Sequence, residues 1–174
     1  MKRLLLLRHA KSSWADPGQA DKDRPLNKRG KEAAPLMGRM MAKRGYIPDL
    51  VLCSTARRTT ETLDRVLPYL PRDIPVQYED GLYLAEAEAL ITRARWIGDD
   101  ADTVLFIGHN PGMEETAVKL ARPRGKGAEA ERRAEIEEKF PTAALAVLTF
   151  DTDCWKDVAE GGGVLTDFIR PRDL

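Results

Sequence analysis

The sequence predicts an α/β fold, in which a mostly parallel central sheet carries helices on both faces in a three-layer sandwich. Three apolar segments, 4–7, 50–53 and 103–107, contain no alternation of polar and apolar residues. Such runs are typical of strands that are buried on both faces. Segments with a helical spacing of apolar residues lie between them. Strands that alternate with helices form βαβ units, whose right-handed connections bring parallel strands into one sheet.

The first strand, 4–7, consists of four leucines and ends at Arg8 and His9. A polar loop, 10–24, follows it, and loops of this length within a compact domain are often functional. The next segment is a predicted helix with Asn27 as its N-cap, and it ends at Gly45. Leu36, Met37, Met40 and Met41 recur at helical spacing, as expected of the buried side of this helix.

The second strand, 50–53, ends in a polar cluster, 54–60, that contains hydroxyl groups and two arginines. A helix follows the cluster, and Pro68 and Pro71 close it. The apolar side of this helix comprises Leu63, Val66, Leu67 and Leu70.

A weak strand, 75–78, precedes a turn and a third predicted helix, 86–97. The third strong apolar strand, 103–107, runs directly into the segment Gly-His-Asn-Pro-Gly at 108–112. Another helix, 113–120, begins after it.

The segment 122–139 is dense in charges of both signs, and we expect a solvated excursion that becomes helical from Ala128. Two further strands, 144–150 and 164–169, are predicted from their alternating pattern, which is typical of a sheet edge. Three glycines, 161–163, lie between these two strands.

Length and composition narrow the class of protein. A chain of 174 residues suits one domain, 1–174, and its 28 basic and 28 acidic residues give a formal net charge of zero. The balanced charge argues against a nucleic-acid or membrane-surface binder. The two cysteines, Cys53 and Cys154, stand in no metal-ligand spacing and suggest a reducing environment. The apolar run after Met1 is too short for a signal peptide, so we expect a cytoplasmic protein.

Polar groups follow each of the three strong strands at the point where it ends. Arg8 and His9 follow the first strand, 54–58 follows the second, and Gly108 and His109 follow the third. Because parallel strands end at one edge of a sheet, where α/β folds bind ligands, we expect these groups to converge. Both histidines of the chain lie in such positions, which predicts a functional site.

Two arginines and two histidines form a suitable site for a compact dianion. The planar guanidinium of arginine matches the oxygens of a phosphate. A histidine with its ordinary pKa is largely neutral at pH 7 and is able to attack phosphorus, while a second histidine stabilises charge on the phosphate oxygens. No carboxylate cluster demands a metal ion, so we expect neither a metal nor a cofactor.

Three motifs in this order resemble those of the histidine phosphatase (phosphoglycerate mutase-like) superfamily. The segment 7–14 (Leu-Arg-His-Ala-Lys-Ser-Ser-Trp) resembles the Arg-His-Gly signature, 54–62 resembles the second motif, and 108–112 resembles the second-histidine motif. The segments 24–30 and 140–143 are most similar to the SixA-type phosphohistidine phosphatase branch. The resemblance implies the phosphoglycerate mutase-like form of the α/β sandwich.

The same resemblance implies a role for each site residue. His9 is the expected nucleophile, which forms a phosphohistidine intermediate, and Arg8, Arg58 and His109 complete the phosphate pocket. Arg58 rather than Arg57 matches the motif. Ser12 is expected to add a hydrogen bond to the phosphate.

The chain departs from the family pattern at two points. Ala10 stands where the signature usually has glycine. The family often supplies an acid to protonate the leaving group, and the nearest candidates here are Glu79 and Asp80, for which a structural turn is an equal alternative. An alkoxide leaving group needs such an acid more than an imidazole does. The uncertain acid therefore favours a phosphohistidine protein as substrate over a small phosphoester.

Other functions remain as alternatives. A small-molecule phosphomonoesterase of the same superfamily and a non-catalytic phosphate-binding module both fit the motifs in part. A cysteine-dependent phosphatase needs an arginine at a spacing from Cys53 where this chain has Thr59. A dinucleotide-binding module needs a glycine-rich turn that is missing after the first strand. The two histidines lack an evident third ligand for a metal ion.

Overall fold

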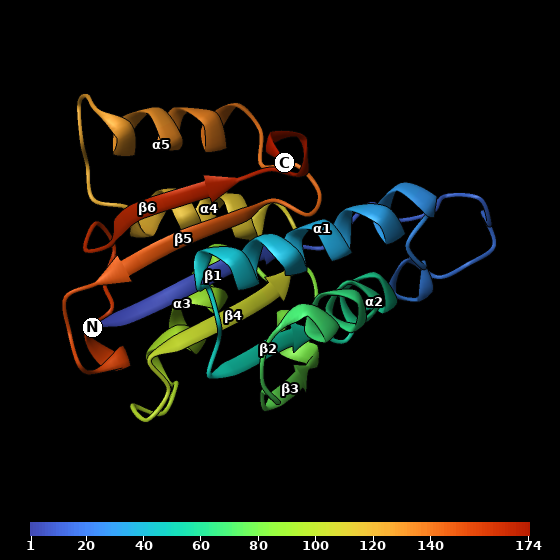
Figure 1. The fold of residues 1–174 in the computed structure, drawn as a ribbon, viewed down its shortest axis with the longest axis horizontal. Helices are drawn as coiled ribbons and strands as arrows, with labels where there is room; N and C mark the ends of the chain where they lie inside the picture. The colour runs from blue at the N-terminus through green and yellow to red at the C-terminus, as the bar shows by residue number, and fades with distance from the viewer.

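The computed structural model describes residues 1–174, and its six strands form one sheet in the order β3-β2-β4-β1-β5-β6 (Figure 1). The strands are β1 (Lys2–Arg8), β2 (Leu50–Ser54), β3 (Val76–Glu79), β4 (Thr103–Gly108), β5 (Leu145–Phe150) and β6 (Val164–Ile169). The helices are α1 (Lys28–Arg44), α2 (Arg57–Val66), α3 (Ala87–Arg95), α4 (Gly112–Leu120) and α5 (Ala128–Glu138).

The sheet is mostly parallel. β3, β2, β4 and β1 pair in parallel, whereas β5 pairs antiparallel with both β1 and β6. In Figure 1, α1 and α2 lie in front of the sheet, and α3 and α4 lie behind it. The predicted sandwich, with helices on both faces of a mostly parallel sheet, is therefore confirmed.

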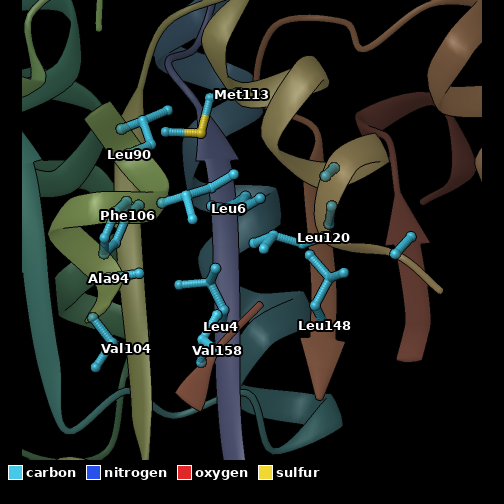
Figure 2. Close-up of a cluster of buried hydrophobic side chains, with 14 of the residues drawn as sticks. Leu4, Leu6, Leu90, Ala94, Val104, Phe106, Met113, Leu120, Leu148 and Val158 are labelled. Atoms are coloured by element: carbon cyan, nitrogen blue, oxygen red, sulfur yellow. The ribbon is translucent and has the colours of Figure 1, made fainter. Parts of the chain in front are cut away.

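The leucines of β1 show why a strand without alternation suits the centre of this sheet. Leu4 and Leu6 belong to the core on the side of α3 and α4, whereas Leu5 and Leu7 belong to the core on the other side. All four side chains are fully buried. Figure 2 shows Leu4 and Leu6 beside side chains of the neighbouring strands β4 and β5 and of the helices, including Phe106, Leu148, Leu90 and Leu120.

Helix α1 has the predicted caps. The side chain of Asn27 accepts a hydrogen bond from the backbone N–H of Gly30, and Gly45 ends the helix in the left-handed conformation with φ of 75°. A Cβ atom on Gly30 would lie 2.2 Å from the carbonyl oxygen of Lys11. Only glycine therefore allows the first turn of α1 to lie this close to the loop after β1.

Three expectations from the sequence need correction. Leu36 is exposed, because it lies on the outer side of α1. Of the last two strands, β6 lies at an edge of the sheet, whereas β5 lies inside it and its residues 145–148 are buried on both faces. The charged segment does form a helix from Ala128, as predicted, but it is not wholly solvated, since Ile136 belongs to the core.

The strand register brings the three motifs to the same edge of the sheet. Arg8 pairs with Gly108, and Cys53 pairs with Ile107, so β1, β2 and β4 end side by side. The residues that follow these strands therefore meet at one edge of the sheet.

None of the helices combines the length and apolar composition that crossing a bilayer requires.

Candidate active site

A cavity of about 360 Å³ lies at this edge of the sheet. Ten of the twelve residues that line it are polar or charged, and they come from the ends of β1 and β4, the loop 10–24, the first turn of α2 and the segment before β5. The lining residues are Arg8, His9, Lys11, Ser12, Trp14, Asp21, Arg24, Arg58, Leu84, His109, Asn110 and Thr142. Two larger hollows, of about 900 and 920 Å³, lie elsewhere on the surface and contain neither histidine.

His9 is held by a hydrogen bond between one ring nitrogen and the backbone. Its Nδ1 lies 2.7 Å from the carbonyl oxygen of Ala10, which only accepts hydrogen bonds, so Nδ1 carries the proton. Nε2 is therefore the unprotonated nitrogen of the neutral ring. Burial lowers the pKa of His9 from 6.5 to about 3, and the ring stays neutral at physiological pH.

His109 has the opposite arrangement. Its Nε2 lies 2.8 Å from the hydroxyl oxygen of Ser54, and that oxygen accepts a hydrogen bond from the N–H of Ala56. The Ser54 hydroxyl keeps a proton and a second lone pair, so the direction of this hydrogen bond follows the tautomer of His109. When the hydroxyl donates to Nε2, the proton of the neutral His109 ring is on Nδ1. Burial is the main cause that lowers the pKa of His109 to about 4. The two histidine rings are 5.4 Å apart, centre to centre.

Two of the three arginines that line the cavity, Arg8 and Arg58, each keep a buried nitrogen without a partner. Arg8 donates from Nη1 to the carbonyl of Phe140, and Arg58 donates to the carbonyl and the carboxylate of Asp21. The Nε atoms of both arginines and Nδ1 of His109 are buried and make no hydrogen bond within the protein. Because unpaired buried polar atoms are costly, three of them on residues that line one cavity suit an anion site.

The loop 10–24 contributes a carboxylate that the sequence analysis missed. Asp21 accepts hydrogen bonds from Tyr83 at 2.5 Å and from Nη2 of Arg58 at 2.9 Å. The hydrogen bond from Tyr83 and those from the arginines hold the pKa of the Asp21 carboxyl below its ordinary value. Asp21 is the one carboxylate that lines the cavity. Its position in a loop offers no periodic signal by which the sequence could have revealed it.

The loop also contributes a buried arginine and an exposed aromatic residue. Arg24 is 6% exposed and donates to Asp21 and to the hydroxyl of Ser12, as well as to the carbonyl of Ser13. The indole ring of Trp14 lies over its guanidinium, 3.6 Å from the ring centre. Ser12 therefore lies at the cavity as predicted, but its hydroxyl already contacts Arg24.

The structure places the candidate acids elsewhere. Glu79 forms a bidentate ion pair with Arg93 of α3, and Asp80 bonds with Thr55 and Lys22. Neither lines the cavity. The end of β3 turns these carboxylates toward basic and hydroxyl partners outside it, so the expectation that either is a general acid receives no geometric support.

The structure also places the other residues that the sequence analysis singled out, Arg58, Arg57 and Cys53. Arg58 is 2% exposed and lines the cavity, whereas Arg57 is exposed and pairs with Glu61 one turn along α2. Cys53 is a buried core thiol, as expected, and burial raises its pKa to about 12. No three His, Cys, Asp or Glu side chains gather into a set of metal ligands.

Comparisons with known proteins agree with the fold and the motifs. A model of the histidine phosphatase superfamily (branch 1) matches residues 4–87. An uncharacterized protein of Mycobacterium tuberculosis is 39% identical over 166 residues, which cover 95% of this chain and 100% of that protein.

Two solved structures resemble the chain over almost its whole length. Both proteins are assigned as the phosphohistidine phosphatase SixA. The protein from Nakamurella multipartitia has a TM-score of 0.82 and 31% identity, with 98% of this chain and 96% of that chain covered. The protein from Agrobacterium tumefaciens has a TM-score of 0.76 and 33% identity, with 98% of each chain covered.

Proposed function

Because this chain belongs to the histidine phosphatase superfamily, and within it to the SixA type, we propose that it is a phosphatase in which His9 is the nucleophile. Residues 1–174 would form one histidine-phosphatase domain, which the single sheet supports. The observation that carries the proposal is the set of donors around the cavity. Nε of Arg8, Nε of Arg58 and Nδ1 of His109 are buried without partners, and their residues line the same cavity as His9.

This set of groups suits phosphoryl transfer. The transition state spreads negative charge over the three equatorial oxygens of the phosphoryl group. Arg8, Arg58 and His109 supply fixed donors for these oxygens, and each charge-assisted hydrogen bond typically contributes about 1.5–3 kcal/mol. Preformed donors need no reorganisation during the reaction. The donors thus supply the stabilisation that a metal ion supplies in other phosphotransferases.

In the proposed reaction, Nε2 of His9 attacks phosphorus with its lone pair while the bond from phosphorus to the leaving group breaks. The leaving group departs with the electrons of that bond and takes a proton from solvent. A water molecule then attacks the phosphorus of phosphorylated His9, which releases inorganic phosphate and restores the ring. The hydrogen bond from Nδ1 to the Ala10 carbonyl keeps the ring in the required tautomer throughout.

The charge of the cavity supports a phosphohistidine protein as the substrate. Asp21, the one carboxylate that lines the cavity, has a lowered pKa and is therefore a poor proton donor near pH 7. An alkoxide leaving group needs such a donor, whereas a phosphorylated imidazole whose second ring nitrogen carries a proton leaves as a neutral ring. We therefore favour phosphohistidine proteins over small phosphoesters as the substrate class.

The test is the hydrolysis of a phosphohistidine protein, a phosphoserine peptide and a small sugar phosphate at one pH, compared by kcat/KM. We expect the phosphohistidine protein to be preferred, and His9→Ala to abolish turnover while the circular dichroism spectrum stays unchanged. A chelator should leave the activity intact. Binding of phosphate without turnover would instead support a phosphate-binding module.

The candidate acids provide a separate arm of this test. Glu79→Gln and Asp80→Asn should leave kcat/KM within about twofold for every substrate, because neither carboxylate lines the cavity. If sugar phosphates were the better substrates and one of these substitutions removed that activity, the protein would be a small-molecule phosphatase with a general acid.

A further inference from the structure

Two exposed apolar side chains line an otherwise polar cavity. Trp14 is 77% exposed and Leu84 is 53% exposed, and they are the only hydrophobic residues among the twelve that line it. The phosphoryl group needs neither of them, since Arg8, Arg58 and His109 already supply its donors. An apolar surface beside a phosphate site indicates a contact with the part of the substrate that carries the phosphoryl group.

Trp14 is held in place from one side. Its ring lies over the guanidinium of Arg24, at a distance of 3.6 Å that is typical of stacking. Arg24 is itself immobilised by hydrogen bonds to Asp21, Ser12 and Ser13. The indole is therefore fixed on one face by an ordered guanidinium, and its high exposure leaves most of the rest of this cavity-lining ring accessible.

Leu84 adds a second apolar contact on a backbone that is held in an unfavourable conformation. Its φ is 51°, in the left-handed region that favours glycine. The next residue, Ala85, is held by the start of α4, because a Cβ atom on Gly112 would lie 2.0 Å from the Ala85 carbonyl oxygen. The fold thus presents a leucine at this cavity in spite of the strain.

We propose that Trp14 is a specificity-determining residue that stacks on a planar leaving group, such as the imidazole ring of phosphohistidine, while the phosphoryl group lies against His9. This inference rests on the proposed function and names the part of the site that selects the substrate. A cavity of about 360 Å³ leaves room for a small ring beside the phosphoryl group. A flat ring stacks favourably on an aromatic face, whereas a flexible sugar or serine chain gains less.

The experiment compares two substrates that both lose phosphate by cleavage of a P–N bond. Phosphohistidine carries its phosphoryl group on a ring, and phosphoramidate has no ring. We expect Trp14→Ala to lower kcat/KM for phosphohistidine about tenfold, the equivalent of about 1.4 kcal/mol, and that for phosphoramidate by less than about twofold. Trp14→Phe keeps an aromatic face and should restore most of the activity.

The matched control is Trp96→Ala. Trp96 is 80% exposed and does not line the cavity, so this substitution removes the same exposed surface without touching the site. It should leave kcat/KM unchanged for both substrates. An equal loss on both substrates in Trp14→Ala would mean that Trp14 only supports Arg24, and it would overturn the proposal.

A binding measurement separates this inference from the proposed function. The two probes are phenylphosphonate, which has a ring, and methylphosphonate, which does not; calorimetry gives the Kd of each. The wild-type protein should prefer phenylphosphonate, and Trp14→Ala should lose that preference. If the preference survives in Trp14→Ala, the inference is wrong. If the wild type turns over neither substrate but shows the Trp14-dependent preference, the phosphatase proposal fails and the stacking role stands.

Discussion

The hydroxyl oxygen of Ser54 lies 2.8 Å from Nε2 of His109, and this contact couples the tautomer of His109 to the hydroxyl group. The Ser54 oxygen accepts from the N–H of Ala56 and keeps its own proton, which it can donate to Nε2. In that arrangement the proton of the neutral ring is on Nδ1, which is buried and has no partner in the protein. A residue at the end of β2 thus contacts a ring nitrogen on the segment after β4.

Replacing Ser54 by alanine tests this relationship. Without the hydroxyl, Nε2 of His109 is free to take the proton, and the cavity loses its Nδ1–H donor. We expect Ser54→Ala to lower kcat/KM about tenfold to a hundredfold, the equivalent of about 1.5–3 kcal/mol for one hydrogen bond to a charged group. The ¹⁵N chemical shifts of His109 should show the change of tautomer.

A matched control for this substitution is Thr60→Ala. The hydroxyl of Thr60 bonds to the carbonyl of Arg57 within α2 and lies outside the cavity. This variant should keep the activity of the wild type. An unchanged His109 tautomer in Ser54→Ala would show that some other contact positions the proton.

Alanine substitutions of the two adjacent arginines of α2 should have very different effects on kcat/KM. Arg58 is buried and lines the cavity, whereas Arg57 is exposed and pairs with Glu61. We expect Arg58→Ala to lower kcat/KM by at least about a hundredfold and to weaken inhibition by inorganic phosphate, since it removes a charged donor. Arg57→Ala should change kcat/KM less than about threefold, because exposed ion pairs contribute little. Equal effects would mean that the phosphate lies nearer the outer end of the helix.

The two buried histidines should make the folded state sensitive to acid. Burial lowers the pKa of His9 to about 3 and that of His109 to about 4, whereas an unfolded chain protonates both near 6.5. Below about pH 6.5 the unfolded state therefore binds more protons than the folded state. The free energy of unfolding should fall by up to about 1.4 kcal/mol per pH unit for each histidine, until the pH reaches the folded pKa. Above about pH 7 neither histidine changes the free energy of unfolding with pH, because both are neutral in the folded and the unfolded state.

Urea denaturation at about pH 7 and pH 5 measures this loss. In His9→Gln the neutral side chain cannot titrate, so the difference between the two pH values should be smaller than in the wild type. An identical difference in both proteins would show that His9 is not kept neutral by burial.

Substitutions of Leu84 should separate its effect on the stability of the fold from its contact with the substrate. Its φ of 51° costs a leucine on the order of 1 kcal/mol, and glycine avoids this cost. We expect Leu84→Gly to keep or raise the Tm while it lowers kcat/KM for phosphohistidine. Leu84→Ala keeps a Cβ atom in the strained conformation, so its Tm should be lower than that of the glycine variant. A lower Tm in Leu84→Gly would show that the packing of the leucine outweighs the strain.

Much of the fold could be predicted from local pattern. The leucines of β1 predicted a strand buried on both faces, and the caps Asn27 and Gly45 defined α1, because both features depend on neighbours in the chain. β5 was misplaced at the sheet edge because alternation alone does not show which strand becomes its neighbour. Its antiparallel pairing with β1 is a contact between residues far apart in the sequence. The predicted cytoplasmic location stays a prediction.

The sequence by itself predicted that Arg8, His9, His109 and the polar cluster 54–58 would lie at one edge of the sheet, because parallel strands end at a common edge. The choice of Arg58 over Arg57 came from the resemblance of the motif. Only the tertiary structure decided which nitrogen of each histidine is engaged within the protein, since Nδ1 of His9 contacts the carbonyl of Ala10 and Nε2 of His109 contacts the hydroxyl of Ser54. It also brought Asp21, Arg24, Trp14 and Leu84 to the cavity. These residues lie in loops, where no periodicity constrains direction, and their positions follow from how the loops pack on the ends of the sheet.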